Sequence, residues 1–264
     1  MKKIITVIIT SMLLISSAVP SFAMVSNLTN ENETIAEQTE FISEMEASLE
    51  EAGTTVESEI SSLIINYEGV LASLTDPSEI EKVQALIDSA TELLESYTLY
   101  QEKTHDQVLD SPKSKRTLQR AASIHDVAIA AIVSYFTLAN YPMSTEFLLH
   151  AQANNVTDST YTPTMGNIYA SSVTTDVKNQ ANRGIQYGNA EYPKSASAAA
   201  QKDLYFAIHG FSWERIYGNL VLIKDRYDFA PGDPYDGLAQ TAVNAMFIAQ
   251  QAGALTPFQV RIQA

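Results

Sequence analysis

The sequence predicts an α+β protein, in which an acidic N-terminal helical hairpin or bundle precedes a small antiparallel sheet packed on helices. Two observations indicate this class. Apolar residues recur at helical spacing through the first 110 residues, and later two runs rich in aromatic and β-branched residues flank Gly218-Asn219, a favoured two-residue hairpin turn. Helices followed by strands are typical of α+β folds.

A leader precedes these elements. Two lysines stand before the apolar run 4–19, which is followed by the small-residue end Ser21-Phe22-Ala23. This order is typical of a Sec signal peptide, so we expect cleavage after Ala23 and a secreted, extracellular protein. The other strongly apolar run, 127–139, is short for a bilayer span, and no membrane span is expected after cleavage.

Charge divides the mature chain into an acidic helical region, 24–110, and an α+β module, 111–264. The first part has 20 Asp and Glu against two lysines, a net charge of -18, and the second has 11 acidic and 12 basic residues. So acidic a chain disfavours nucleic acid as a partner. The acidic stripe is either a solvated helix face or a receptor for a cationic partner.

The acidic region predicts three amphipathic helices, interrupted near Gly53 and at Asp76-Pro77. A fourth helix is expected from Ser111-Pro112 to about Ala139. Its first turns carry cations, the wrong sign for a helix N-terminus, and we expect it to dock on the acidic helices. These cations are Lys113, Lys115, Arg116 and Arg120.

A short helix is expected over 144–153, capped by Ser144. The following segment, 154–202, is rich in small and polar residues and predicts a long irregular stretch with a partial helix near 171–181. At the C-terminus, Asp236 predicts the cap of a helix over 237–252, Gly253 closes that helix, and a last strand covers 258–262.

The hairpin is expected over Asp203–Phe229, DLYFAIHGFSWERIYGNLVLIKDRYDF. A tight turn at Gly218-Asn219 would place His209 opposite Asp228 and Trp213 opposite Lys224. One strand face then mixes aromatic and cationic side chains and is expected to be a partly exposed binding surface. Its predicted binding residues are Trp213, Phe211, Arg215, Arg226 and Tyr217.

Three stretches resemble a C-terminal module of uncharacterised secreted proteins of Gram-positive bacteria: DLYFAIHG from Asp203, DRYDF from Asp225, and AQQAGALTPF from Ala249. The resemblance covers roughly 139–264 and leaves the acidic helices outside. It implies a self-contained module joined to variable N-terminal regions, and it implies no activity or site residues.

His209 and Asp228 are the candidate catalytic residues. A carboxylate beside an imidazole stabilises the charged ring and orients it, as a general base requires, although such cross-strand pairs also stabilise sheets. A triad that adds Ser212 is disfavoured, because residues three apart on a strand point to opposite faces.

Two weaker patterns suggest metal-binding sites. Asp225, Asp233 and Asp236 lie with Asp228 around a Pro-Gly turn and offer oxygen ligands for calcium, without the spacing of an EF-hand loop. Glu146 and His150, four apart on a helix, provide only two zinc ligands. The chain has no phosphate loop and no dinucleotide fingerprint, so no cofactor is expected.

These patterns favour a secreted binding or interaction module. Its partner would be an extracellular or cell-envelope protein, a peptide or a wall component. The alternative is a secreted hydrolase or toxin-like effector that uses His209 and Asp228. In a third possibility the acidic helices act through dimerisation.

Overall fold

A computed structural model describes residues 31–106, 124–164, 175–192, 199–230 and 238–264. The expected leader, the cations at 113–120, the division at residue 110, and Asp233 and Asp236 lie outside these residues. The α+β prediction is confirmed, since the described residues form helices and a five-stranded sheet. By their contacts the described residues form two compact units, which are described separately below.

The three predicted acidic helices are confirmed as α2 (Glu31–Glu51), α3 (Val56–Leu71) and α4 (Pro77–Asp106). The two interruptions have clear physical causes. Gly53 has a φ of 79°, a left-handed conformation that suits glycine at a helix end. The side chain of Asp76 accepts a hydrogen bond of 2.8 Å from the amide of Ser78 and so caps α4.

The first unit comprises Met1–Asn66, Asp88–Tyr135 and Phe229–Leu255. It contains α2, most of α3, α4 and α5 (Ile124–Leu138), and α10 (Leu238–Gln251), which agrees with the helix expected at 237–252. On α5, the buried Ser134 hydroxyl donates to the carbonyl of Val56, so this helix contacts α3 as expected. On each acidic helix the buried side chains of this unit are mostly apolar and form one stripe.

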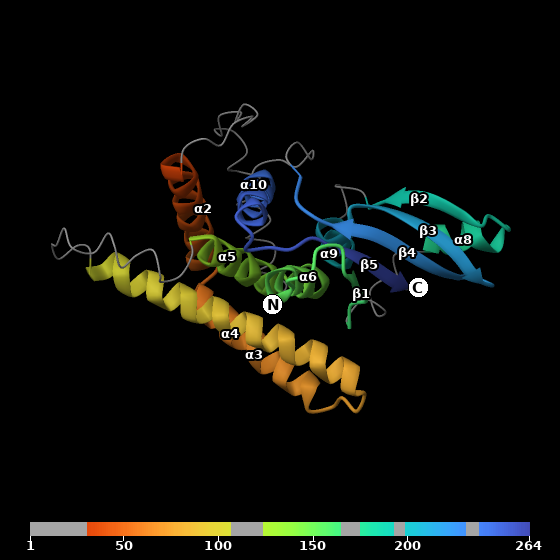
Figure 1. The fold of residues 1–264 in the computed structure, drawn as a ribbon, viewed down its shortest axis with the longest axis horizontal. Helices are drawn as coiled ribbons and strands as arrows, with labels where there is room; N and C mark the ends of the chain where they lie inside the picture. The colour runs from red at the N-terminus through yellow and green to blue at the C-terminus, as the bar shows by residue number, and fades with distance from the viewer. Residues whose placement is uncertain (1–30, 107–123, 165–174, 193–198, 231–237) are drawn as a thin grey trace. The chain divides into compact units, whose positions relative to one another are not determined.

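The second unit comprises Tyr67–Ile87, Phe136–Asp228 and Thr256–Ala264 and holds the sheet. The strands run in the order β1-β5-β4-β3-β2 and lie side by side in Figure 1. All neighbours are antiparallel except the parallel pair of β1 and β5. The strands are β1 (Thr160–Tyr161), β2 (Tyr187–Glu191), β3 (Gly210–Tyr217), β4 (Leu220–Tyr227) and β5 (Phe258–Gln263).

Two sequence predictions for this unit were wrong. The segment 154–202 was expected to be irregular apart from a partial helix near 171–181. That helix is confirmed as α8 (Thr175–Asn182), but the segment also supplies the unpredicted strands β1 and β2. The start of the expected hairpin is instead a helix, α9 (Ala199–Ile208). Alanines at its start favour a helix, and Leu204, Ala207 and Ile208 are buried at helical spacing.

Helix α6 (Pro142–Ala153) is held at its N-terminus by a residue from α9. The Asp203 carboxylate accepts hydrogen bonds from the amide of Met143 at 3.0 Å, the amide of Ser144 at 2.8 Å and the Ser144 hydroxyl at 2.7 Å. The predicted cap, Ser144, therefore lies inside the first turn and does not cap the helix itself. The carboxylate satisfies amides that a helix N-terminus leaves without intrahelical partners.

Candidate functional site

The turn of the β3–β4 hairpin is where the sequence placed it, but the pairing beyond the turn differs. Tyr217 faces Leu220, as expected for a two-residue turn at Gly218-Asn219. The register then shifts between Arg215 and Tyr217, so that Trp213 faces Ile223 rather than Lys224. Such a bulge adds one residue to one strand, and a one-residue shift moves the side chains beyond it to the other face.

The shift places two predicted binding residues in the core. Trp213 is 2% exposed and Phe211 is 5% exposed, on the same face as the buried Val221, Ile223 and Tyr227. Helices α8 and α9 contact β4 of this sheet. The expectation that Trp213 and Phe211 belong to an exposed binding face was therefore wrong, because the register turns both side chains inward.

The predicted catalytic pair is not formed by the hairpin. His209 precedes β3, and the ladder between β3 and β4 ends at Ser212 and Lys224, so the register does not place His209 opposite Asp228. The His209 ring contacts the ring of Tyr205 at 4.6 Å between centroids. Asp228 instead forms an ion pair with Arg226. A catalytic role for the two residues thus loses its geometric basis.

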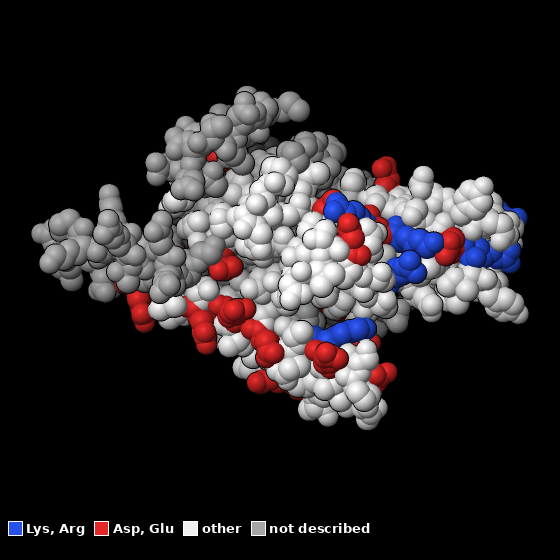
Figure 2. Space-filling view, viewed as in Figure 1, with Lys and Arg blue, Asp and Glu red and all other residues white. Residues whose placement is uncertain are grey.

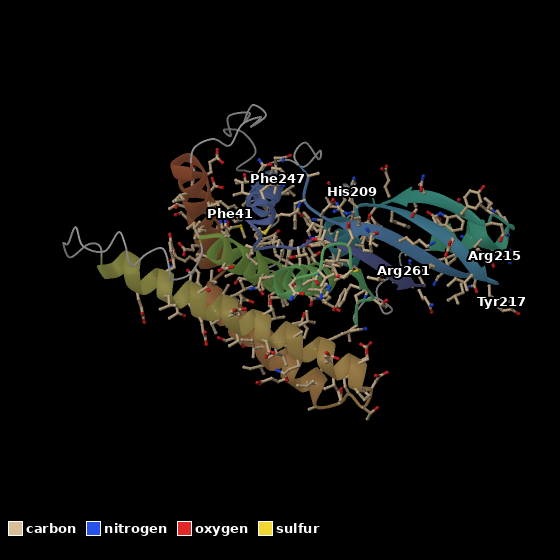
Figure 3. The ribbon with its side chains drawn as sticks, in the orientation of Figure 1. Phe41, His209, Arg215, Tyr217, Phe247 and Arg261 are labelled. Atoms are coloured by element: carbon tan, nitrogen blue, oxygen red, sulfur yellow. The ribbon has the colours of Figure 1, made fainter. Side chains whose placement is uncertain are left out.

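The other three predicted binding residues reach the surface in different places. Arg226 pairs with Asp158 at 2.8 Å as well as with Asp228. Arg215 donates from Nε to the carbonyl of Gly218 at 2.7 Å, and Tyr217 is 83% exposed. Figure 3 shows Arg215 and Tyr217 together at one end of the sheet, away from His209.

This end of the sheet exposes a group of large apolar side chains, which we call the sheet tip. The tip comes together because β2 begins beside the β3–β4 turn: Tyr187 pairs with Glu214, and the Arg215 amide donates to the carbonyl of Gln186 at 2.7 Å. Among the described residues, ten large hydrophobic side chains are exposed, and five of them form the sheet tip: Ile185, Tyr187, Ile216, Tyr217 and Leu220.

Four of these five residues were not predicted from the sequence. Tyr187 lies in a segment that was expected to be irregular, and Ile216 and Leu220 were not among the predicted binding residues of the hairpin. Two signals in the sequence could have indicated them. One is the aromatic Tyr187 before the small residues Gly188 and Ala190, and the other is the group of apolar residues beside the turn. Neither signal identifies a surface without the pairing of β2 with β3.

The outward face of the sheet is polar. In one row across four strands, Asn189 faces Ser212, Ser212 faces Lys224, and Lys224 faces Arg261. Lys224 forms an ion pair with Glu214 at 2.6 Å. Figure 2 shows Lys and Arg side chains gathered over the sheet, and Figure 3 places Arg261 among them. This face therefore offers cations and neutral hydrogen-bonding groups beside the apolar tip.

Glu146 and His150, which could supply only two zinc ligands, belong to a buried network around α6. Glu146 is fully buried and accepts hydrogen bonds from the Tyr161 hydroxyl at 2.7 Å and the Thr164 amide at 2.6 Å. The His150 ring stacks on Tyr161 at 3.7 Å, and burial lowers the pKa of His150 to about 4. Both side chains thus have structural contacts. Within the described parts of the chain, no three His, Asp or Glu side chains are grouped to hold a metal.

Of the four aspartates around this turn, Asp225 and Asp228 are described, and Asp228 pairs with Arg226. Asp225 lies on the core face of β4, between Ile223 and Tyr227 and opposite the buried Val260. Burial raises the pKa of the Asp225 carboxyl to about 7, and the nearby charge of Asp228 adds to this rise. A carboxylate on this face is therefore destabilising when charged.

Asp225→Asn is expected to stabilise the protein above neutral pH. Because the folded-state pKa of about 7 exceeds the ordinary value of 3.8, wild-type stability falls as the pH rises between these two values. The neutral amide removes this loss, so the free energy of unfolding should rise by about 1–2 kcal/mol at pH 8 and stay unchanged at pH 4. Urea unfolding at both pH values measures it.

Equal pH profiles for Asp225→Asn and wild type would show that Asp225 does not titrate in this way.

Comparisons of the chain with protein-family models, with curated proteins and with solved structures gave no match. None of the helices that the structure describes is both long enough and apolar enough to cross a bilayer.

Proposed function

We propose that the protein is an exported binding module that uses the sheet tip to contact a protein, peptide or wall component of the cell envelope. The observation that carries this proposal is the concentration of exposed apolar side chains at one end of the sheet, with Tyr187 78% and Tyr217 83% exposed. Export is supported by the leader sequence at residues 1–23.

Exposure of the sheet tip to water has a cost in free energy. Large apolar side chains exposed together are unfavourable in water, and in soluble proteins such groups mark interaction sites. Tyrosine is enriched at interfaces because it offers a large apolar surface and a hydroxyl at a low cost in conformational entropy. Arg215, held beside the turn through its bond to the Gly218 carbonyl, adds a cation at the same place.

The test is cosedimentation of the mature chain, 24–264, with isolated cell envelopes. The double variant Tyr217→Ser/Leu220→Ser removes two tip side chains that face each other across the turn. We expect its affinity for envelopes to fall at least about tenfold, which equals 1.4 kcal/mol. Both side chains are exposed, so the fold should be retained.

Ile65→Ser is the matched control, because Ile65 is 66% exposed on α3, outside the tip. This variant should bind as wild type does. Wild type that stays in the supernatant, or a double variant that sediments like wild type, would contradict the proposal.

A further inference from the structure

The strand β2 forms one edge of the sheet. It pairs with β3 on one side, and none of the other described strands pairs with it on the opposite side. Natural edge strands are commonly protected from further pairing by lysine, proline or a bulge. The β2 sequence, YGNAE, contains neither lysine nor proline, and its register with β3 is continuous.

The hydrogen bonds at the two ends of β2 show which of its backbone groups point outward. The Arg215 amide donates to the carbonyl of Gln186 at 2.7 Å, and the Tyr192 amide donates to the carbonyl of His209 at 2.8 Å. In an antiparallel pair, alternate residues bond to the neighbouring strand. Positions 186, 188, 190 and 192 therefore bond to β3 or to His209 just before it, whereas Tyr187, Asn189 and Glu191 direct their amides and carbonyls away from the sheet.

We propose that β2 is a dimer interface, in which the β2 strands of two copies pair antiparallel around a two-fold axis at Asn189. The three outward-directed residues are symmetric about this position. Asn189 then faces Asn189 of the second copy, and Tyr187 faces the second copy's Glu191. Directly opposed residues of this kind exchange both of their backbone hydrogen bonds, so every outward group of β2 gains a partner.

The side chains of β2 are compatible with this pairing. Glu191, the only charged residue of the strand, faces the tyrosine of the other copy, so no like charges are directly opposed. On the core face, Gly188 faces Ala190 of the second copy. Both side chains are too small to obstruct the approach of the two strands. Exposure agrees with an available edge, since Tyr187, Asn189 and Glu191 are all exposed. This self-complementarity favours a second copy over an unrelated strand.

The interface does not depend on the proposed function. A five-residue strand buries a small area, so we expect a dimer that depends on concentration rather than an obligate one. Pairing would join two five-stranded sheets and give the assembly two sheet tips, and a second linked contact raises the apparent affinity for a surface with repeated sites.

Sedimentation velocity of the mature chain tests the proposal, from micromolar to millimolar concentration at about 0.15 M salt, which screens the repulsion between acidic chains. Wild type should pass from monomer to dimer. Asn189→Pro removes an outward-directed amide without breaking a bond to β3 and should stay monomeric. Asn189→Ala keeps the amide and should dimerise. Circular dichroism of each variant shows whether the monomer is folded.

Amide hydrogen exchange of wild type provides a readout that does not depend on a variant. On going from the lowest to the highest concentration, the amides of Tyr187, Asn189 and Glu191 should slow at least about tenfold. Those of Gly188 and Ala190, already bonded to β3, should not change. A monomer at every concentration, a dimer whose outward amides exchange as fast as the monomer's, or protection seen only with envelopes present would each overturn the proposal.

Discussion

Trp213→Ala is expected to lower the free energy of unfolding by about 3–5 kcal/mol, the range measured for removal of a large buried aromatic side chain. Trp213 is 2% exposed on the core face of β3. Its indole lies so close to Gly188 of β2 that a Cβ at that position would meet Nε1 at 3.0 Å. The substitution therefore leaves a cavity beneath the edge of the sheet. Urea denaturation at pH 7 measures the loss.

Tyr217→Ala is the matched control for this prediction. Tyr217 lies on the same strand and is also aromatic, but it is 83% exposed, so its removal should change the free energy of unfolding by less than about 0.5 kcal/mol. A similar loss for both variants, or a larger one for Tyr217→Ala, would mean that the assignment of the two strand faces is wrong.

Asp203→Ala is expected to lower the free energy of unfolding by about 3 kcal/mol or more. The fully buried carboxylate accepts hydrogen bonds from the Met143 amide and from both the amide and the hydroxyl of Ser144. Each buried donor left without a partner costs about 1–3 kcal/mol. Thermal and urea unfolding at pH 7 measure the change, and circular dichroism shows whether the variant folds.

Asp76→Ala provides the comparison, since Asp76 caps α4 at an exposed site through the Ser78 amide. Its loss should cost about 1 kcal/mol, the ordinary value for a helix cap. Burial raises the pKa of Asp203 to about 6, so its charged form is disfavoured and its contribution to stability falls as the pH rises from 3.8 to about 6. Equal losses for the Asp76 and Asp203 variants would contradict the buried-cap account.

The parts of the fold that the sequence predicted are those with local causes. The three acidic helices follow from apolar spacing, with breaks at Gly53 and at Asp76-Pro77. The hairpin turn follows from Gly218-Asn219, and the last strand and the helix before it from Gly253 and the apolar residues on either side. In each case a few neighbouring residues determine the conformation.

The parts that it did not predict depend on contacts between distant residues. The bulge between Arg215 and Tyr217 leaves no mark in the alternation of apolar residues, yet it decides which face holds Trp213. The β2 sequence has low strand propensity and becomes a strand through its pairing with β3. Asp203 caps a helix 59 residues away from it in the chain, for which no local pattern exists. The candidate site changed with the register, from the centre of the hairpin to its tip.

The proposed function and the expected effect of Trp213→Ala both depend on the two faces of the sheet, and the chain's single tryptophan reports them directly. We predict that the native protein shows short-wavelength tryptophan emission that iodide barely quenches, because the indole of Trp213 is buried. Emission at the wavelength of the urea-unfolded chain, readily quenched by iodide, would contradict the register and with it the assignment of the core and outward faces.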